Sequence, residues 1–323
     1  MTLRTPLTER LGIEHPVLLA PMDLVSDGRL AAAVSAAGGL GLLGAGYGEE
    51  AWLARELDVL AHSRQRYGVG FITWSLATQP RLLDLVLERQ PVAVMLSFGD
   101  PAPWVDRIHD AGALAICQVQ SLASARQAVA AGADILVAQG TEGGGHGGMR
   151  GLVTFVPEII DAVADGRPVV AAGGIADGRG LAAALMLGAA GVLLGTRFYA
   201  TEEAAGSRVA KQRICDVGGD DTARSIVFDI SRRRVWPHPY TGRCVRNAHA
   251  QRWIGREVEL LQRAEEIAPA YARARAEEDF DVAAVIAGEA SGLIDEVTPV
   301  ATVMQRVTGQ AETILRDGAR LLA

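Results

Sequence analysis

The sequence of 323 residues has few cysteines, and they are far apart. Cys117, Cys215 and Cys244 form no C-x-x-C pair and have no histidines at metal-ligand spacing, so neither a redox dithiol nor a metal site is indicated. The N-terminal segment MTLRTPLTERLG lacks the apolar core of a signal peptide. We therefore expect a protein of the reducing cytoplasm.

Lysine is almost absent and aromatic residues are scarce. Lys211 is the only lysine, aromatic residues make up 5% of the chain, and the net charge is −7. An acidic chain is a poor general binder of nucleic acid. No lysine ends any expected strand, which argues against Schiff-base aldolase chemistry and pyridoxal phosphate.

Long hydrophobic segments are interrupted as well. The uncharged stretch 30–48 contains six glycines, a serine and a tyrosine. It divides into a helix, a turn and a strand, so we interpret it as soluble core and expect no membrane span. Apolar residues still make up 49% of the chain, which is enough for a sizeable core.

A repeated pattern runs through the first 200 residues. In SAAGGLGLLGAG, HDAGALAICQV, VAAGADILVAQG and LMLGAAGVLLGT, a helical pattern ends at a glycine and a short apolar run follows. Continuous apolar runs are typical of strands buried on both faces, as in parallel sheets. The strands are expected at residues 16–20, 40–44, 67–72, 92–97, 113–118, 134–138, 168–172 and 191–195.

Helical patterns lie between these strands, at residues 27–37, 49–64, 79–89, 101–111, 121–131, 153–164 and 177–187. Asp27, Ser121 and Asp177 are the expected N-caps. Eight β/α units favour a (β/α)₈ TIM barrel over an open doubly wound sheet.

The pattern changes after Arg197. Residues 206–299 are expected to form helices and loops without clear strands, including a helix over 252–278 that kinks or breaks at Pro269. Residues 300–322 form an amphipathic helical pattern that can return to the barrel. We expect a barrel of residues 1–205 plus 300–323, with 206–299 as a smaller helical domain inserted before the last barrel helix.

Glycines follow the last two expected strands. Gly173 and Gly174 follow the seventh strand, and Gly195 and Thr196 follow the eighth. These two loops are the usual phosphate site of such barrels; tight turns are the alternative. Rossmann and P-loop motifs are lacking, as is any His-carboxylate cluster for a metal. Flavin mononucleotide, FMN, fits what remains.

The loop after the sixth strand reads QGTEGGGHGG, residues 139–148. Its glycines let the backbone approach a flat ring or a phosphate. His146 would then project into the barrel mouth, where an imidazole can take a proton near neutral pH. For His15, His62, His109, His238 and His249 we expect structural roles.

Several motifs together resemble the nitronate monooxygenases, formerly called 2-nitropropane dioxygenases. They are APM (20–22), SFGDP (97–101), QGTEGGGHGG, AAGGIADG (171–178), LGTRF (194–198) and GRCVRN (242–247). The resemblance implies oxidation of alkyl nitronates, such as propionate 3-nitronate, by O₂ with FMN. His146 would deprotonate a nitroalkane or hold the nitronate. The implied FMN contacts, with Gly173 from the loops above, are Ala20, Pro21, Met22, Gln139, Gly144, Gly174, Leu194, Gly195 and Thr196.

Two positions depart from the family pattern. Gly143 replaces the usual alanine of EAGGH, and Gly70 stands where an asparagine often contacts the flavin. Trp74 could flank the site instead, and Ser97 of SFGDP is a second expected substrate contact.

Other functions remain open. NAD(P)H-dependent quinone or enoyl-acyl-carrier-protein reductases share most of these motifs, and a non-catalytic flavin-binding protein is a further alternative. The arginine-rich segment 231–246 could bind nucleic acid or an acidic partner, but we interpret it as a solvated loop. The expected partners are therefore a small nitronate or nitroalkane and O₂. A homodimer is left open.

Overall fold

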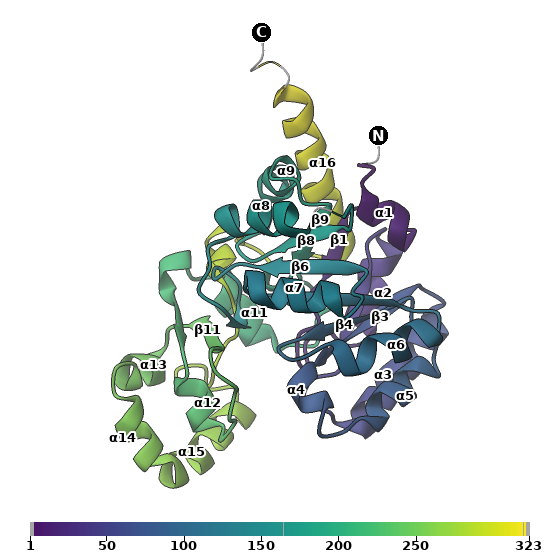
Figure 1. Cartoon of the computed structure of the whole chain (residues 1–323). Helices are drawn as coiled ribbons and strands as arrows, with labels where there is room; N and C mark the ends of the chain where they lie inside the picture. The colour runs from purple at the N-terminus through teal and green to yellow at the C-terminus, as the bar shows by residue number, and fades with distance from the viewer. Residues whose placement is uncertain (1–2, 164, 319, 321–323) are drawn as a thin grey trace.

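The structure, a computed structural model, is built on eight parallel strands (Figure 1). It describes residues 3–163, 165–318 and 320. The strands are β1 (Val17–Leu19), β2 (Gly41–Gly44), β3 (Tyr67–Ile72), β4 (Ala93–Ser97), β5 (Leu114–Val119), β6 (Ile135–Gln139), β8 (Val169–Ala172) and β9 (Gly191–Leu194). A parallel bridge between Leu18 and Leu40 joins the two outer strands of the sheet. The predicted TIM barrel and its eight strands are confirmed.

Helices surround this barrel. They are α2 (Gly28–Ala36), α3 (Glu50–Ser63), α5 (Arg81–Leu87), α6 (Ala102–Asp110), α7 (Leu122–Ala130), α8 (Leu152–Val163), α9 (Gly178–Met186) and α16 (Val300–Gly318), with the short α1 (Pro6–Leu11), α4 (Thr73–Leu76) and α10 (Thr196–Tyr199). The side chains of Asp27, Ser121 and Asp177 accept hydrogen bonds from the first-turn N–H groups of α2, α7 and α9, as predicted. Some residues of the predicted helices and of the predicted barrel ranges lie outside the described part of the chain. They are residues 1–2, 164, 319 and 321–323.

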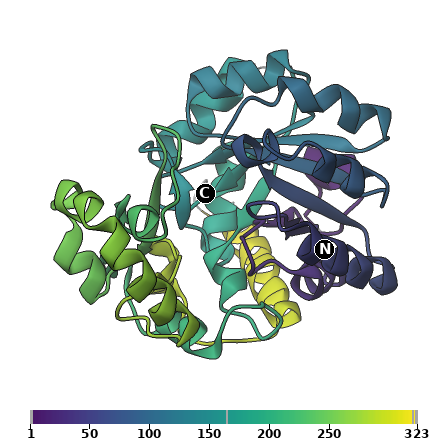
Figure 2. The same ribbon diagram turned by 90° about the horizontal axis from the view of Figure 1, so that it is seen from below.

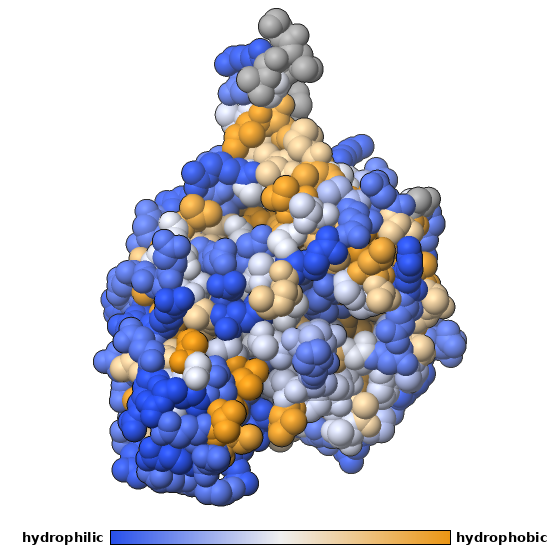
Figure 3. Space-filling view, turned by 60° about the vertical axis from the view of Figure 1, so that its left-hand side comes forward, coloured by the Kyte–Doolittle hydropathy of each residue, from blue (hydrophilic) through white to orange (hydrophobic). Residues whose placement is uncertain are grey.

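The core has two layers. Alternate strand residues such as Leu18, Leu42 and Ile116 fill the barrel interior, and their neighbours pack outward against the helices. α16 closes the ring beside α9, where the Gly178 N–H donates to Gln310 Oε1 at 2.8 Å. The end of α16 projects from the body, and apolar residues lie at the base of this projection on the face that Figure 3 shows. No helix among the described residues is long and apolar enough to cross a membrane.

Residues 206–299 lie beside the barrel (Figure 2) and are not purely helical. The segment contains α11 (Arg208–Cys215), η1 (Gly219–Asp221), β10 (Thr222–Ser225), α12 (Val227–Ser231), β11 (Thr241–Val245), α13 (Ala248–Trp253), α14 (Glu257–Gln262), α15 (Ala264–Ala276) and η2 (Glu289–Leu293). We call residues 206–299 the insert. The expectation of an insert without strands is therefore wrong.

The insert strands explain an unexpected feature of the glycine-rich loop. β10 pairs with β11, and β11 pairs with β7 (Gly145–Gly147), so the loop itself supplies a strand. Glycine makes a weak strand on its own, but here β11 supplies the ladder partner.

The predicted break of the insert's helical region at Pro269 is wrong, because the interruptions lie elsewhere. Pro269 lies inside the continuous helix α15, whereas the interruptions fall at Gly255, with a left-handed φ of 83°, and at Arg263 between α14 and α15. Pro269 is the sixth residue of α15, beyond the first turn, so α15 continues through it although the Glu265 carbonyl lacks the usual N–H donor four residues on.

Candidate active site

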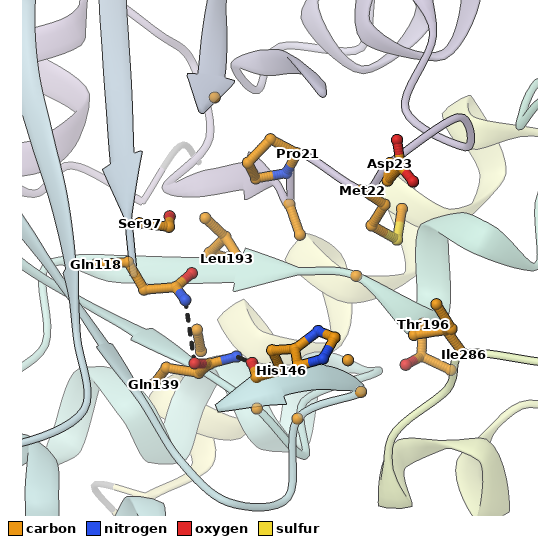
Figure 4. A pocket seen from close by; sticks show the side chains of 18 of the residues that line it. Pro21, Met22, Asp23, Ser97, Gln118, Gln139, His146, Leu193, Thr196 and Ile286 are labelled. Carbon is orange, nitrogen blue, oxygen red and sulfur yellow. Dashed lines mark hydrogen bonds between the residues drawn. The ribbon is translucent and has the colours of Figure 1, made fainter. Parts of the chain in front are cut away.

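A cavity opens at the carboxyl ends of the barrel strands and contains about 1270 Å³ of empty space, part of it open to solvent. Concave sites at this end of a barrel are where ligands usually bind. Most sequence-predicted residues line it together (Figure 4): Ala20, Pro21, Met22, Ser97, Gln139, Gly144, His146, Gly173, Gly174, Gly195 and Thr196.

Two predicted residues lie elsewhere. The Leu194 side chain is buried in the layer between sheet and helices, and Leu193 lines the cavity instead, because successive strand residues face opposite ways. The backbone of Leu194 still contacts the loop after β1, because its carbonyl oxygen accepts a hydrogen bond from the Ala20 N–H at 2.9 Å. Trp74 is not a lining residue; its ring contacts Tyr47 and Trp236, with centroids 6.1 and 5.4 Å away.

The glycine loops bring bare backbone to the cavity wall. Gly173 and Gly174 have left-handed φ angles of 108° and 70°, and Gly195 is the N-cap of α10 without a capping side chain. A Cβ on Gly144 would lie 2.7 Å from backbone atoms of Ala287 and Gly288. Gly173 and Gly174 therefore require glycine for their backbone geometry, and Gly144 requires it for close packing against the insert, whereas a Cβ on Gly195 would make only ordinary contacts.

Arg224 of β10 holds the glycine-rich loop in place. Its guanidinium donates to the carbonyls of Thr141, Gly143 and Gly145 in the loop and to Thr241 of β11. Burial lowers the pKa of Arg224 to about 10, so the group stays charged at neutral pH. Sequence reasoning missed this residue, because nothing in the local pattern of ARS indicates which loop it reaches.

A chain of amides supports the same loop from the barrel side. Gln118 and Gln120 both donate to Gln139 Oε1, at 3.0 and 2.9 Å, and Gln139 Nε2 donates to the His146 carbonyl at 2.9 Å. Most of the Gln139 amide is thus used within the protein (Figure 4). Gln139 orients the backbone of His146, while Gln118 also lines the cavity.

His146 lies between two side chains of the insert. Its Nε2 is 2.9 Å from Asp229 Oδ2, and the Trp236 ring stacks on the imidazole with centroids 3.4 Å apart and planes 6° apart. Burial lowers the pKa of His146; Asp229 acts in the opposite direction, and Arg232 and Arg224 reinforce the lowering. The imidazole is therefore neutral near pH 7 and able to accept a proton.

The arginine-rich segment faces the cavity in part, so its interpretation as a solvated loop is incomplete. Arg232 and Trp236 line the cavity, whereas Arg233 and Arg234 are exposed. Trp236 Nε1 donates to the Tyr47 hydroxyl at 3.0 Å, and its ring meets Phe98 edge-on. The mixture of arginine and tryptophan was the available signal, but it did not show which side chains turn inward.

Two carboxyl groups also line the cavity. Burial raises the pKa of Asp23, although nearby Arg275, Arg232 and Arg234 oppose the shift. Glu142 Oε1 accepts from the Leu152 N–H at 2.9 Å, whereas its Oε2 is buried without a hydrogen-bond partner. A buried acceptor of this kind needs a donor, and an ordered water can supply it.

The other histidines lie away from the cavity. His249 Nε2 is 2.8 Å from Ser231 Oγ, His109 Nε2 is 2.8 Å from Asp134 Oδ2, and His62 Nδ1 is 2.6 Å from the Asp58 carbonyl. Within the described residues, no group of three or more His, Cys, Asp or Glu side chains is placed to hold a metal ion.

These features define a TIM barrel with a ligand site at its C-terminal mouth, walled on one side by an insert. The family model for nitronate monooxygenase matches residues 4–66 and 64–310. The chain belongs to the nitronate monooxygenase family, which is a family of oxidoreductases.

Individual relatives agree with this assignment. A nitronate monooxygenase of Neurospora crassa is 37% identical over 281 residues, which cover 73% of this chain and 74% of that protein. A (3aS,4S,5R,7aS)-5-hydroxy-7a-methyl-1-oxo-octahydro-1H-indene-4-carboxyl-CoA dehydrogenase of Mycobacterium tuberculosis is 39% identical over 237 residues. That match covers 73% of this chain but 66% of the dehydrogenase, slightly less than two thirds of its length.

Solved structures show the same architecture. FabK from Thermotoga maritima superposes with a TM-score of 0.89 at 32% identity, over 99% of this chain and 100% of that one. A nitroalkane oxidase from Streptomyces ansochromogenes gives a TM-score of 0.81 at 26% identity, over 95% and 98% of the two chains.

Proposed function

We infer that this protein oxidises alkyl nitronates of the propionate 3-nitronate type with O₂, using FMN, and that His146 acts on the substrate. The observation that carries this proposal is the position of His146. A neutral, buried imidazole lines the same cavity as the glycine loops after β8 and β9, in a chain of the nitronate monooxygenase family.

The residues present fit FMN. Gly173, Gly174, Gly195 and Thr196 offer backbone N–H groups for a phosphate. Glu142, which also lines the cavity, offers a carboxylate acceptor for a hydroxyl group of the cofactor. When bound, the flavin would take electrons from the nitronate and pass them to O₂.

The family's usual asparagine has no counterpart at Gly70. A side chain there would overlap the ring of Pro21, so Gly70 and Pro21 form a matched pair. Gln118, which lines the cavity from the end of β5, is the available amide for a polar ring contact.

His146 would accept the substrate proton, and Arg232 would stabilise the anion that forms. The neutral imidazole takes the proton from the carbon next to the nitro group, which leaves a nitronate anion and an imidazolium. Arg232 adds positive charge to the wall and favours the anion. Trp236 and Ile286 line the cavity from the insert, which supports a substrate-covering role for residues 206–299.

A second candidate is an NAD(P)H-dependent flavin reductase of the same fold. The 39% identity to a carboxyl-CoA dehydrogenase favours keeping it. The discriminating experiment is anaerobic: propionate 3-nitronate is added to one sample of FMN-loaded protein and NADH or NADPH to another. Bleaching of the flavin by nitronate alone supports the proposal, whereas bleaching by NAD(P)H alone assigns the chain to the reductases.

The role of His146 is tested with His146→Asn. We expect the variant to retain FMN and lose most activity on neutral nitroethane, while activity on preformed nitronate falls less. Nitroethane oxidation equal to that of the parent would rule out the general-base role.

A further inference from the structure

Three side chains form a hydrogen-bonded line from the insert to the cavity. Arg232 Nη2 donates to Asp229 Oδ1 at 3.0 Å, and Asp229 Oδ2 lies 2.9 Å from His146 Nε2. The Asp229 and His146 side chains are only 6% and 8% exposed, so water does not compete effectively for this contact. Asp229 and Arg232 come from α12 and its C-cap, whereas His146 comes from β7 of the barrel loop.

This line determines where the imidazole carries its proton. An ionised carboxylate only accepts hydrogen bonds, so a neutral imidazole meets Asp229 with Nε2–H. Nδ1 is then the nitrogen with a free lone pair. The ring cannot easily turn to exchange the two nitrogens, because Trp236 stacks on its face and Gln139 holds its backbone carbonyl.

We propose that Asp229 is a positioning residue that fixes His146 in the Nε2–H tautomer, so that Nδ1 is the atom that takes the substrate proton, and that Arg232 holds Asp229 for this task. The inference rests on the proposed base role of His146. It makes the insert a working part of the proton-transfer site in addition to a cover. In the transfer, the substrate C–H bond breaks, a proton moves to Nδ1, and the positive charge on the ring faces Asp229.

The charged groups that face His146 determine in which direction each variant should shift its pKa. Asp229 on α12 favours the charged imidazole, whereas Arg232 beside it and Arg224 on β10 disfavour it. Trp236, which stacks on the ring, and Tyr47, which accepts from Trp236, are neutral. Removing Asp229 should therefore lower the pKa of His146, and removing Arg232 should raise it.

The first test needs no variant. Flavin-loaded protein with ¹⁵N-labelled histidine is measured by NMR above pH 7, and the His146 signals are identified by their loss in His146→Asn. We expect a protonated Nε2 and an unprotonated Nδ1. A protonated Nδ1 would overturn the proposal whatever the activity of the enzyme.

The second test compares Asp229→Asn and Arg232→Gln with Asp216→Asn, an exposed aspartate of the insert. For nitroethane, we expect kcat/KM of Asp229→Asn to fall about tenfold or more, with its acidic limb moved to lower pH. The acidic limb of Arg232→Gln should move to higher pH, and Asp216→Asn should match the parent. Preformed nitronate should be oxidised by Asp229→Asn with a smaller loss.

The outcomes distinguish the positioning role of Asp229 from the base role of His146. An Asp229→Asn variant that binds flavin but keeps the parent's pH profile removes the positioning role. A His146→Asn variant with full nitroethane activity removes the base role itself, while the NMR tautomer still reports whether Asp229 orients the ring. If Asp229→Asn does not fold, the NMR result and the Arg232→Gln profile decide.

Discussion

At the scale of single residues, two neighbouring glycines in the same loop have different reasons to be glycine. A Cβ on Gly144 would press on the backbone of Ala287 and Gly288 at 2.7 Å, where nothing can rotate away. A Cβ on Gly143 would meet the Gly140 carbonyl oxygen at 3.3 Å, a tight contact that a small shift relieves. Alanine, which the family usually has at position 143, is therefore compatible with this loop.

We predict that Gly144→Ala lowers the free energy of unfolding by about 1–3 kcal/mol, because the insert must move away from the loop. Gly143→Ala should stay within about 1 kcal/mol of the parent, since the lost chain entropy of the unfolded state offsets the tight contact. Urea unfolding of both variants, with flavin content measured alongside, provides the check. Equal stability of the two would contradict the close approach at Gly144.

At the scale of elements, the sequence predicted the barrel better than the insert. The strand ending at Leu194 and the helix capped by Asp177 each carry a local signal: an apolar run, or a capping side chain followed by helical residues. β11 has no such signal: its partner β7 lies far away in the sequence, and the irregular arginine-rich segment separates it from its other partner, β10. The inward position of Trp236 depends on the same long-range pairing.

The residues of the candidate site differ in the same way: some have a local sequence signal and others depend on long-range contacts. His146 and the glycines were predictable from composition and from their place after strands. Asp229, Arg224 and Arg232 were not, because each acts on a segment that lies about 80 residues from it in the sequence. Contacts at such separation leave no periodicity in the chain.

Arg224 provides a prediction for the glycine-rich loop as an element. Replacement by glutamine removes the charge and the guanidinium donors to the half-buried carbonyls of Gly143 and Gly145, whereas the Thr141 carbonyl still accepts from Arg243 Nε. We expect Arg224→Gln to cost roughly 2–4 kcal/mol in unfolding free energy and to speed amide exchange over residues 140–148. Arg233→Gln, at an exposed ion pair with Glu265, should change stability by less than about 0.5 kcal/mol. Unchanged loop exchange in Arg224→Gln would refute the assigned role.

At the scale of the whole molecule, buried neutral histidines make stability depend on pH. Burial lowers the pKa of His146 and of His249. When the pH falls below 6.5, the usual histidine value, the unfolded chain binds protons that the folded one does not, so stability decreases. The raised pKa values of Asp23 and Asp27 act in the opposite direction: the stability they contribute is fully present below 3.8, their ordinary value, and is lost as the pH rises through the raised values.

We therefore predict that the free energy of unfolding falls between about pH 7.5 and about pH 5.5. His249→Gln, which can keep a hydrogen bond to Ser231, should show a smaller fall than the parent. Urea unfolding at both pH values, with the flavin content held equal, measures the difference. A parent whose stability stays level or rises on acidification in this range would contradict the lowered pKa values of these histidines.

The cavity joins the barrel and the insert, so a ligand in it should stabilise both. Its walls include Gly174 and Thr196 of the barrel and Trp236 and Ala290 of the insert. We predict that adding FMN to flavin-free protein slows amide exchange in β10, β11 and the glycine-rich loop as well as in the loops after β8 and β9. At about one hundred times its dissociation constant, a ligand adds about 2.7 kcal/mol of stability. The outer helices α14 and α15, which contribute no lining residue, should exchange at unchanged rates. Protection confined to the barrel loops would mean that the insert packs against His146 without responding to the cofactor site.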